Sequence, residues 1–302
     1  MAISMDADDR LESARRLLVA GTPGDVAAAI EHLDAGAALG EAPASCLLAV
    51  LAGAGIGRAR DFRSAIAHLR NAARAGSPLA IGQLEVLAPA EGEDITEVWG
   101  RPCQKRVLSA SPRIVAIDNF LSSAACDWLI ARAGARLSPA AVFGQTEKAS
   151  DPGASRTNRA FEFELFDLDL VVVMTRARIA ATVGAPDGAL ETSQVFNYRR
   201  GQRFARHHDW LDPGVPAQAA DIARFGQRAV TFLTYLNSDF DGGETEFPRL
   251  GLRHKGAAGS ALYFGNLDAA GAGDPRTVHE GLPPTRGEKW LLSQWIRNRA
   301  RV

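Results

Sequence analysis

The chain has 302 residues, enough for two ordinary domains or one large one, and its 46% hydrophobic and 23% charged residues are typical of a globular protein. Its 34 Lys and Arg residues against 35 Asp and Glu residues give a net charge of -1, which disfavours nucleic acid as a partner. No uncharged stretch reaches membrane-spanning length, so we expect no membrane partner. The three cysteines are too few for a disulfide scaffold and favour reduced thiols in a cytoplasmic protein.

Residues 1–90 are rich in Ala, Leu, Gly and Arg and poor in aromatic residues, a composition that favours helices. Within this region Ala29–Leu33 recurs 36 residues later as Ala65–Leu69, and Gly40 recurs at the same spacing as Gly76. A period of this length, with Gly at helix ends, is typical of stacked helical hairpins. The segment resembles tetratricopeptide-like repeats of the short SEL type, so we predict an α-helical repeat segment over residues 1–90.

The composition changes after this helical segment. Residues 91–112 contain Pro and acidic residues and are predicted to form a linker. A β-like run at Ile114–Ile117 follows, and then a helix capped by Ser122 or Ser123. Further strands are expected at apolar runs divided by turn signals, at residues 194–196, 229–236, 260–264 and 289–296. Short strands divided in this way predict a jelly roll or barrel over residues 113–302, and hence an α+β multidomain chain.

The segment 198–210 carries the residues most suggestive of chemistry. On a strand, the side chains of His207 and Asp209 project to one face and that of His208 to the other. An imidazole and a carboxylate on one face can bind the same metal, and one distant His would complete the two-His, one-carboxylate triad of non-haem Fe(II) oxygenases. Because His-x-Asp often arises by chance, a surface or hydrogen-bonded histidine pair is the alternative interpretation.

The remaining histidines point to one partner. The chain has six. His32 and His68 lie in the helical repeats, and His254 lies in a basic, Gly-rich loop. His279, on a later predicted strand, is therefore the natural third ligand.

A lysine opens the last predicted strand. Alternation places Lys289, Leu291, Ser293 and Trp295 on one face of the run 289–296. A cation and a hydroxyl that face a barrel interior are unfavourable without a partner. A dicarboxylate co-substrate with one end on the metal would supply that partner.

Residues 113–302 resemble the 2-oxoglutarate- and Fe(II)-dependent dioxygenases of the prolyl 4-hydroxylase type. The matching stretches, in order and spacing, are Gln194-Val195 with Tyr198, Gly201-Gln202, His207-x-Asp209, Tyr235-Leu236-Asn237, Gly242-Gly243-Glu244-Thr245-x-Phe247-Pro248, His279-x-Gly281, and Gly287-x-Lys289-Trp290 with Trp295. The resemblance implies a double-stranded β-helix (jelly-roll) domain over residues 113–302.

The resemblance also implies a cofactor set. Fe(II) would be bound by His207, Asp209 and His279, and Lys289 would pair with the distal carboxylate of 2-oxoglutarate. O₂ would be the oxidant, and ascorbate is a candidate reductant. The products would be a hydroxylated substrate, succinate and CO₂.

The resemblance also implies roles for four further residues. Tyr235 and Ser293 are candidate donors to the 2-oxoglutarate carboxylate, Tyr198 would lie close to the co-substrate, and Trp295 would line the substrate pocket near the metal. Tyr198 and Tyr235 could instead be core aromatics whose hydroxyls bond to the backbone. Trp290 is assigned to packing.

The sequence departs from the family pattern in three places. Phe204 stands where the family commonly has Tyr, and His208 stands where an aromatic residue is more usual. The connection 211–227 is long and is a candidate substrate loop, as is the polar stretch 144–159, which has the composition of a flap. The intact Asp209 argues against halogenase chemistry, which requires a halide at that position.

Three kinds of function remain open at this point. The family's best-represented activity favours hydroxylation of a prolyl residue in a peptide or protein, and the alternative within enzymes is a free amino acid or a small natural product. The repeats could instead make the chain a non-catalytic interaction protein, although all four metal and co-substrate positions are filled. A zinc hydrolase lacks an obvious general base and leaves Lys289 unexplained. The sequence predicts neither the position of hydroxylation nor the oligomeric state.

Overall fold

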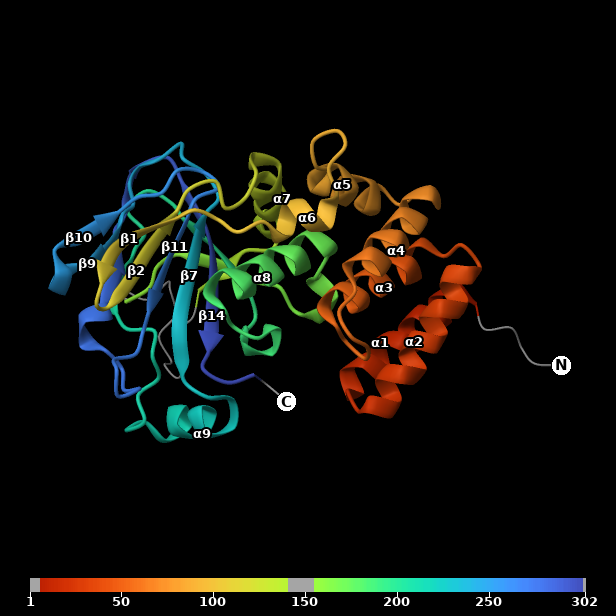
Figure 1. The fold of residues 1–302 in the computed structure, drawn as a ribbon, viewed down its shortest axis with the longest axis horizontal. Helices are drawn as coiled ribbons and strands as arrows, with labels where there is room; N and C mark the ends of the chain where they lie inside the picture. The colour runs from red at the N-terminus through yellow and green to blue at the C-terminus, as the bar shows by residue number, and fades with distance from the viewer. Residues whose placement is uncertain (1–5, 141–154, 301–302) are drawn as a thin grey trace. The chain divides into compact units, whose positions relative to one another are not determined.

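A computed structural model describes residues 6–140 and 155–300 (Figure 1). The chain divides into two compact units. One comprises Met1–Arg101 with Glu164–Thr175, and the other comprises Pro102–Phe163 with Arg176–Val302. Among the described residues, none of the helices is both long enough and apolar enough to cross a membrane.

The first unit is helical, as the composition predicts. Its helices are α1 (Ala7–Ala20), α2 (Pro23–Ala38), α3 (Ala42–Ala54), α4 (Phe62–Arg74), α5 (Pro78–Leu87) and α6 (Ile95–Gly100), with a short 3₁₀ turn, η1 (Leu165–Asp167). The hydroxyl or carboxylate of Thr22, Asp61 and Ser77 caps α2, α4 and α5 by accepting a backbone N–H of the first turn. These caps explain why the helices begin where they do.

Equivalent positions of the 36-residue sequence repeat have equivalent surroundings. Ala29 and Leu33 on α2 are buried, and so are Ala65 and Leu69 on α4. Gly40 and Gly76, which follow α2 and α4, both have positive φ, the conformation that favours glycine at helix ends. The sequence repeat is therefore also a structural one, because α2 and α4 bury residues at equivalent positions of the repeat.

One segment of the helical unit comes from far along the chain. The backbone N–H of Leu170, at the start of α8 (Leu170–Val183), donates to the buried Gln83 side chain of α5 at 2.7 Å. A Cβ built on Gly53 would lie 2.9 Å from the Leu170 side chain, so only glycine allows α3 to pack so closely on this segment. Composition alone did not predict that residues 164–175 would pack with the N-terminal helices.

The second unit is dominated by three sheets. The strands are β1 (Lys105–Ala110), β2 (Arg113–Ile117), β3 (Ser138–Pro139), β4 (Arg159–Glu162), β5 (Gln194–Tyr198), β6 (Phe204–His207), β7 (Arg228–Tyr235), β8 (Asp241–Gly242), β9 (Thr245–Phe247), β10 (Leu252–His254), β11 (Ala261–Gly265), β12 (His279–Gly281), β13 (Pro284–Arg286) and β14 (Lys289–Arg297). Eight form a sheet in the order β1-β2-β11-β7-β14-β5-β4-β3, four form a sheet in the order β10-β9-β12-β6, and β13 pairs with β8. Adjacent strands in all three sheets are antiparallel. This is the jelly-roll class that the sequence predicts, and part of the larger sheet is visible as β1, β2, β11 and β7 in Figure 1.

Shorter elements complete this unit. They are α7 (Ser123–Gly134), the C-terminal part of α8, α9 (Pro216–Phe225), and the 3₁₀ turns η2 (Asp187–Ala189), η3 (Pro248–Leu250) and η4 (Pro275–Thr277). Ser122 caps α7, as predicted, by accepting the N–H of Ala125. The long connection 211–227 contains α9, and the predicted linker 91–112 contains α6 and β1. Most of the candidate flap 144–159 lies outside the described residues.

The core of the second unit lies between the large and the four-stranded sheets. Phe247 of β9 meets Phe264 of β11 edge to face, with ring centroids 5.0 Å apart. Both rings also contact His279. Burying large aromatic side chains is strongly favourable, so these contacts anchor β12 and its histidine against the larger sheet.

Candidate active site

Two of the predicted metal ligands face each other across neighbouring strands. His207 ends β6, and β12 pairs with β6 so that His279 lies directly opposite it. The two ring centroids are 4.3 Å apart. The Nδ1 atoms lie 2.8 and 3.0 Å from the backbone oxygens of Ala205 and Thr277. With Nδ1–H donating to a carbonyl, each Nε2 keeps a free lone pair for a metal.

Asp209 lies just beyond the end of β6. Its Oδ1 is 3.6 Å from His207 Nε2, and its Oδ2 is 3.6 Å from His279 Nε2. One ligand atom from each of the three side chains lies within 4.8 Å of the others. This donor set matches the two-His, one-carboxylate triad, which leaves coordination positions open. The residues therefore fit Fe(II).

The electrostatics of the triad suit metal binding. Burial and the adjacent His279 ring lower the pKa of His207 to about 3, so its imidazole is neutral at physiological pH. Burial alone would raise the pKa of Asp209, but the two imidazoles and a hydrogen bond from Thr231 hold it below the usual value. Neutral imidazoles and an ionised carboxylate are the forms that coordinate metals.

His208 is separated from the triad, as strand alternation predicts. Its side chain is exposed and stacks on Trp210, with ring centroids 3.6 Å apart. His207, in contrast, stacks on Phe204 at 3.5 Å. The pairing of His207 with His279 therefore selects His207 as a ligand, whereas His208 lies beyond the end of β6 with its ring on Trp210.

A narrow recess runs from the triad to Lys289. Its volume is about 30 Å³. The Lys289 side chain is 1% exposed, and its Nζ donates to the backbone oxygen of Gly243 at 2.8 Å. Among the described residues, no carboxylate lies within ion-pair distance of Nζ. Burial lowers the pKa of Lys289 to about 7.

The other predicted residues lie close to Lys289. The face Lys289, Leu291, Ser293 and Trp295 of β14 lines the recess, as alternation predicts. Tyr198 lines it too, and its ring centroid is 5.4 Å from Lys289 Nζ. Burial raises the pKa of the Tyr198 hydroxyl to about 12, so it stays protonated and able to donate.

Tyr235 is placed differently from the other predicted donors. Its ring is also 5.4 Å from Lys289 Nζ, but its hydroxyl donates to the backbone oxygen of His254 at 3.2 Å and lies 3.1 Å from Thr245 Oγ1. Thr245, unlike Tyr235, lines the recess. A carboxylate beside Lys289 would therefore meet the Thr245 hydroxyl, which sequence reasoning missed although it lies inside the Gly-Gly-Glu-Thr motif.

A larger cavity of about 610 Å³ lies on the other side of the triad. Phe204, His207, Asp209 and Trp295 line both spaces. The rest of its lining is mostly polar, including Arg156, Glu162, Glu191, Arg206, Asp221, Arg228 and Arg297. Sequence reasoning missed these residues because they come from separate strands, loops and α9.

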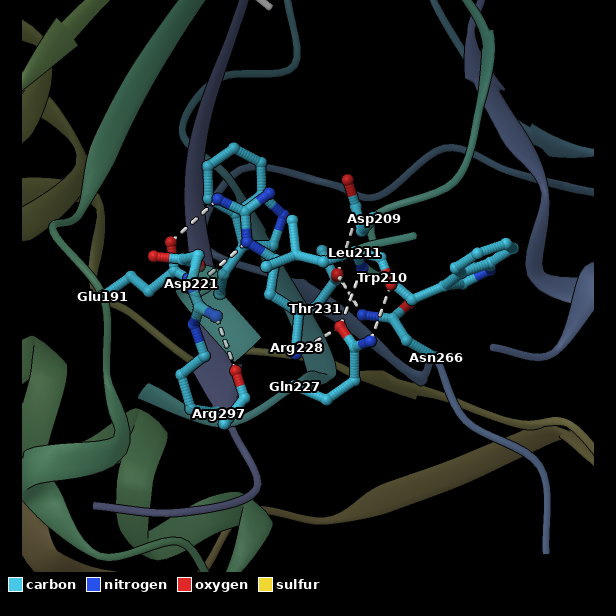
Figure 2. A network of polar contacts seen from close by, with 12 residues as sticks. Glu191, Asp209, Trp210, Leu211, Asp221, Gln227, Arg228, Thr231, Asn266 and Arg297 are labelled. Atoms are coloured by element: carbon cyan, nitrogen blue, oxygen red, sulfur yellow. Dashed lines mark hydrogen bonds and ion pairs between the residues drawn. The ribbon is translucent and has the colours of Figure 1, made fainter. Parts of the chain in front are cut away.

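Ion pairs connect much of this lining (Figure 2). Arg228 donates twice to Glu191, at 2.8 and 2.9 Å, and Arg297 Nε lies 2.5 Å from the same carboxylate. Arg297 also pairs with Asp221 of α9 at 2.6 Å. The Arg228 guanidinium lies 3.8 Å from the centroid of the Trp295 ring. These contacts hold Trp295 at the junction between the recess and the outer cavity.

Comparison with known proteins places the chain in a family. Residues 193–297 match the 2OG-Fe(II) oxygenase superfamily. Prolyl 4-hydroxylase 1 of Arabidopsis thaliana is 31% identical over 208 residues, covering 64% of this chain and 72% of the relative. This chain is a prolyl 4-hydroxylase-like 2OG-Fe(II) oxygenase. Prolyl 4-hydroxylase 2 of the same plant is 30% identical to the oxygenase over 216 residues, covering 65% of it and 70% of the relative.

A solved structure is also similar to the oxygenase. The viral collagen prolyl hydroxylase vCPH from Paramecium Bursaria Chlorella virus-1, in its 2OG complex, is 27% identical and covers 61% of this chain and 94% of its own, with a TM-score of 0.47. The family match and the geometry of the triad identify Fe(II) and 2-oxoglutarate as the cofactor and co-substrate of the oxygenase, and His207, Asp209 and His279 as its iron site.

Proposed function

We propose that this oxygenase hydroxylates a prolyl residue in a peptide or protein and releases succinate and CO₂. The observation that carries the proposal is the cavity beside the iron ligands. Its 610 Å³ falls within the ~300–1,000 Å³ of sites that bury drug-sized ligands, more than a free amino acid needs. The names of the Arabidopsis relatives also favour proline as the residue modified.

The side chains that line the recess and those that line the outer cavity would have separate roles. His207, Asp209 and His279 hold the iron, and the Lys289 ammonium holds the far carboxylate of 2-oxoglutarate by a charge-assisted contact. Tyr198, Ser293 and Thr245 are the proposed additional contacts of the co-substrate, whereas Tyr235, which the sequence also suggested, lies behind Thr245 and would act through it. When bound, Fe(II), 2-oxoglutarate and O₂ supply the oxidising power that converts a C–H bond into an alcohol.

Trp295 would line the substrate side of the iron site. It faces both the recess and the outer cavity, and the Arg228 guanidinium packs on its ring. A rigid wall at this point would keep water out and hold the reacting C–H bond in one orientation. The protein's own contribution is therefore positioning.

We also propose that the chain consists of SEL-type repeats over residues 1–90, a linker over 91–112 and the oxygenase domain over 113–302. The matched burial of Ala29 with Ala65 and of Leu33 with Leu69 supports the repeat assignment. Helical repeats often bind extended peptides, and a role in holding the substrate would suit this architecture.

A substrate panel tests the proposed function. Succinate release and the mass gain of one oxygen atom would be measured with free proline, with a short prolyl peptide and with a long prolyl peptide. We expect turnover of the peptides and none of free proline, with a lower KM for the long peptide if the repeats contribute. Turnover of free proline with no turnover of either peptide would favour the small-molecule alternative.

A further inference from the structure

A buried chain of hydrogen bonds leads away from the iron ligand Asp209. Thr231 Oγ1 donates to Asp209 Oδ2 at 2.7 Å, and Asn266 Nδ2 donates to Thr231 Oγ1 at 2.9 Å (Figure 2). Asp209 is 5% exposed, Thr231 1% and Asn266 0%. Because Thr231 and Asn266 are almost fully buried, they hydrogen-bond to protein groups, and the three side chains determine one another's orientation.

The donor and acceptor in each of these hydrogen bonds are fixed by the ionised carboxylate of Asp209. An ionised carboxylate only accepts hydrogen bonds, so the single hydrogen of the Thr231 hydroxyl goes to Asp209. The Thr231 oxygen must then accept from its other neighbour, and the Asn266 amide nitrogen is a donor. Asn266 therefore prevents the hydroxyl from turning away from Asp209.

Both supporting residues are themselves held in place. Thr231 lies in the middle of the larger sheet, paired with Phe264 of β11 and Trp295 of β14. Asn266 follows β11, where its N–H donates to Ala229 O at 2.8 Å and its backbone oxygen accepts from the Asp274 N–H at 2.9 Å. The contact from Thr231 to Asp209 thus joins the rigid sheet to the loop that carries the iron ligand.

One further detail indicates what Asn266 contributes. Its Oδ1 is buried and has no hydrogen-bond partner within the described part of the chain. An unpaired buried amide oxygen is unfavourable. The amide is therefore better explained by the hydrogen bond that its nitrogen donates than by general stabilisation of the core.

We propose that Thr231 and Asn266 are positioning residues for the iron site. By engaging Oδ2 of Asp209 from the side of the larger sheet, they orient the carboxylate so that Oδ1 is presented to the metal. This inference concerns iron binding alone and does not depend on which substrate is hydroxylated.

The proposal is tested by Fe(II) affinity, measured anaerobically by competition with a chromophoric chelator, without 2-oxoglutarate or substrate. Thr231→Val removes the hydroxyl and keeps the shape, and we expect it to weaken Fe(II) binding ~10–100-fold, the usual effect of losing such an outer partner. Thr231→Ser should restore near-wild-type affinity. Asn266→Leu should give a smaller, several-fold loss, because the hydroxyl is still present but no longer oriented.

Thr234 provides the matched control. It is a second buried threonine of β7, and its hydroxyl has no hydrogen-bond partner among the residues described. Thr234→Val should leave Fe(II) affinity unchanged, and thermal unfolding of each metal-free variant separates loss of fold from loss of binding. If Thr231→Val binds Fe(II) as tightly as Thr234→Val, the proposal is wrong. If Thr231→Val does not fold, wild-type affinity in Asn266→Leu contradicts it instead, whereas failure of the wild type to bind Fe(II) would contradict the iron site itself.

Discussion

The recess and the outer cavity share four lining residues but differ in how their buried charges are paired. In the recess, Lys289 has no carboxylate partner among the described residues, and the histidine Nε2 atoms present free lone pairs. In the outer cavity, Glu191 is engaged by two guanidinium groups, and one of these also binds Asp221. The Lys289 ammonium thus needs a ligand to pair its charge, whereas Glu191, Asp221, Arg228 and Arg297 of the outer cavity already pair with one another. Unpaired buried charge therefore marks the cofactor site, and paired charge marks its scaffold.

The largest effect is expected at the triad. His279→Ala removes an iron ligand, and we expect Fe(II) affinity to fall by more than ~100-fold, since loss of an outer partner alone costs ~10–100-fold. Succinate release should fall to background. His208→Ala is the matched control for Fe(II) affinity, because His208 is next to a ligand in sequence but its ring stacks on Trp210. Equal loss of iron in the two variants would contradict the assigned strand register.

The next largest effect is expected at the far end of the recess. Lys289→Ala should weaken 2-oxoglutarate binding by ~10–150-fold, the equivalent of the ~1.5–3 kcal/mol of a charged hydrogen bond. Fe(II) affinity should not change. Lys255→Ala, which removes a nearby lysine outside the recess, is the control. Isothermal titration with 2-oxoglutarate measures both variants, and equal affinities would remove Lys289 from the co-substrate site.

The unusual pKa of Lys289 predicts a pH dependence. In the free protein burial lowers this pKa to about 7, and a bound carboxylate would raise it. Binding therefore takes up a proton above pH 7, and the Kd for 2-oxoglutarate should rise with pH by up to ~10-fold per unit until the bound-state pKa is reached. Lys289→Arg, whose guanidinium stays charged, should show a flatter profile. Affinity that increases above pH 7 in the wild type would contradict this mechanism.

The smallest effect on the cofactors is expected from the outer cavity. Asp221→Asn weakens the ion pair with the buried Arg297 and should lower stability by ~1–3 kcal/mol. The Kd values for Fe(II) and 2-oxoglutarate should match those of the wild type. Denaturant unfolding and the two titrations measure these quantities together. A large change in 2-oxoglutarate affinity would show that the outer network is part of the cofactor site after all.

The parts of the site that follow strand periodicity could be predicted from the sequence. His207 and Asp209 lie two residues apart and converge while His208 stacks on Trp210, the grouping that alternation predicted, although β6 itself ends at His207. The same rule predicted which face of β14 lines the recess, from Lys289 to Trp295. These predictions succeeded because the side-chain direction on a strand depends only on local geometry.

The parts that depend on contacts between distant segments could not be predicted. Thr231 shares a face with Tyr235 on the same strand, but its bond to Asp209 exists only because two sheets meet there. The pair of Glu191 with Arg297 joins positions more than one hundred residues apart. The return of Leu170 to the helical unit is of the same kind. Such contacts leave no periodic signal in the sequence.

The most direct test of the account is an anaerobic titration of the purified protein with Fe(II) and then 2-oxoglutarate, followed by the visible charge-transfer band of the chelate. We predict a band in the wild type that is lost in His279→Ala and needs much more 2-oxoglutarate to appear in Lys289→Ala. A wild-type protein that retains no Fe(II) and shows no band would contradict the claim that the recess is completed by this metal and co-substrate.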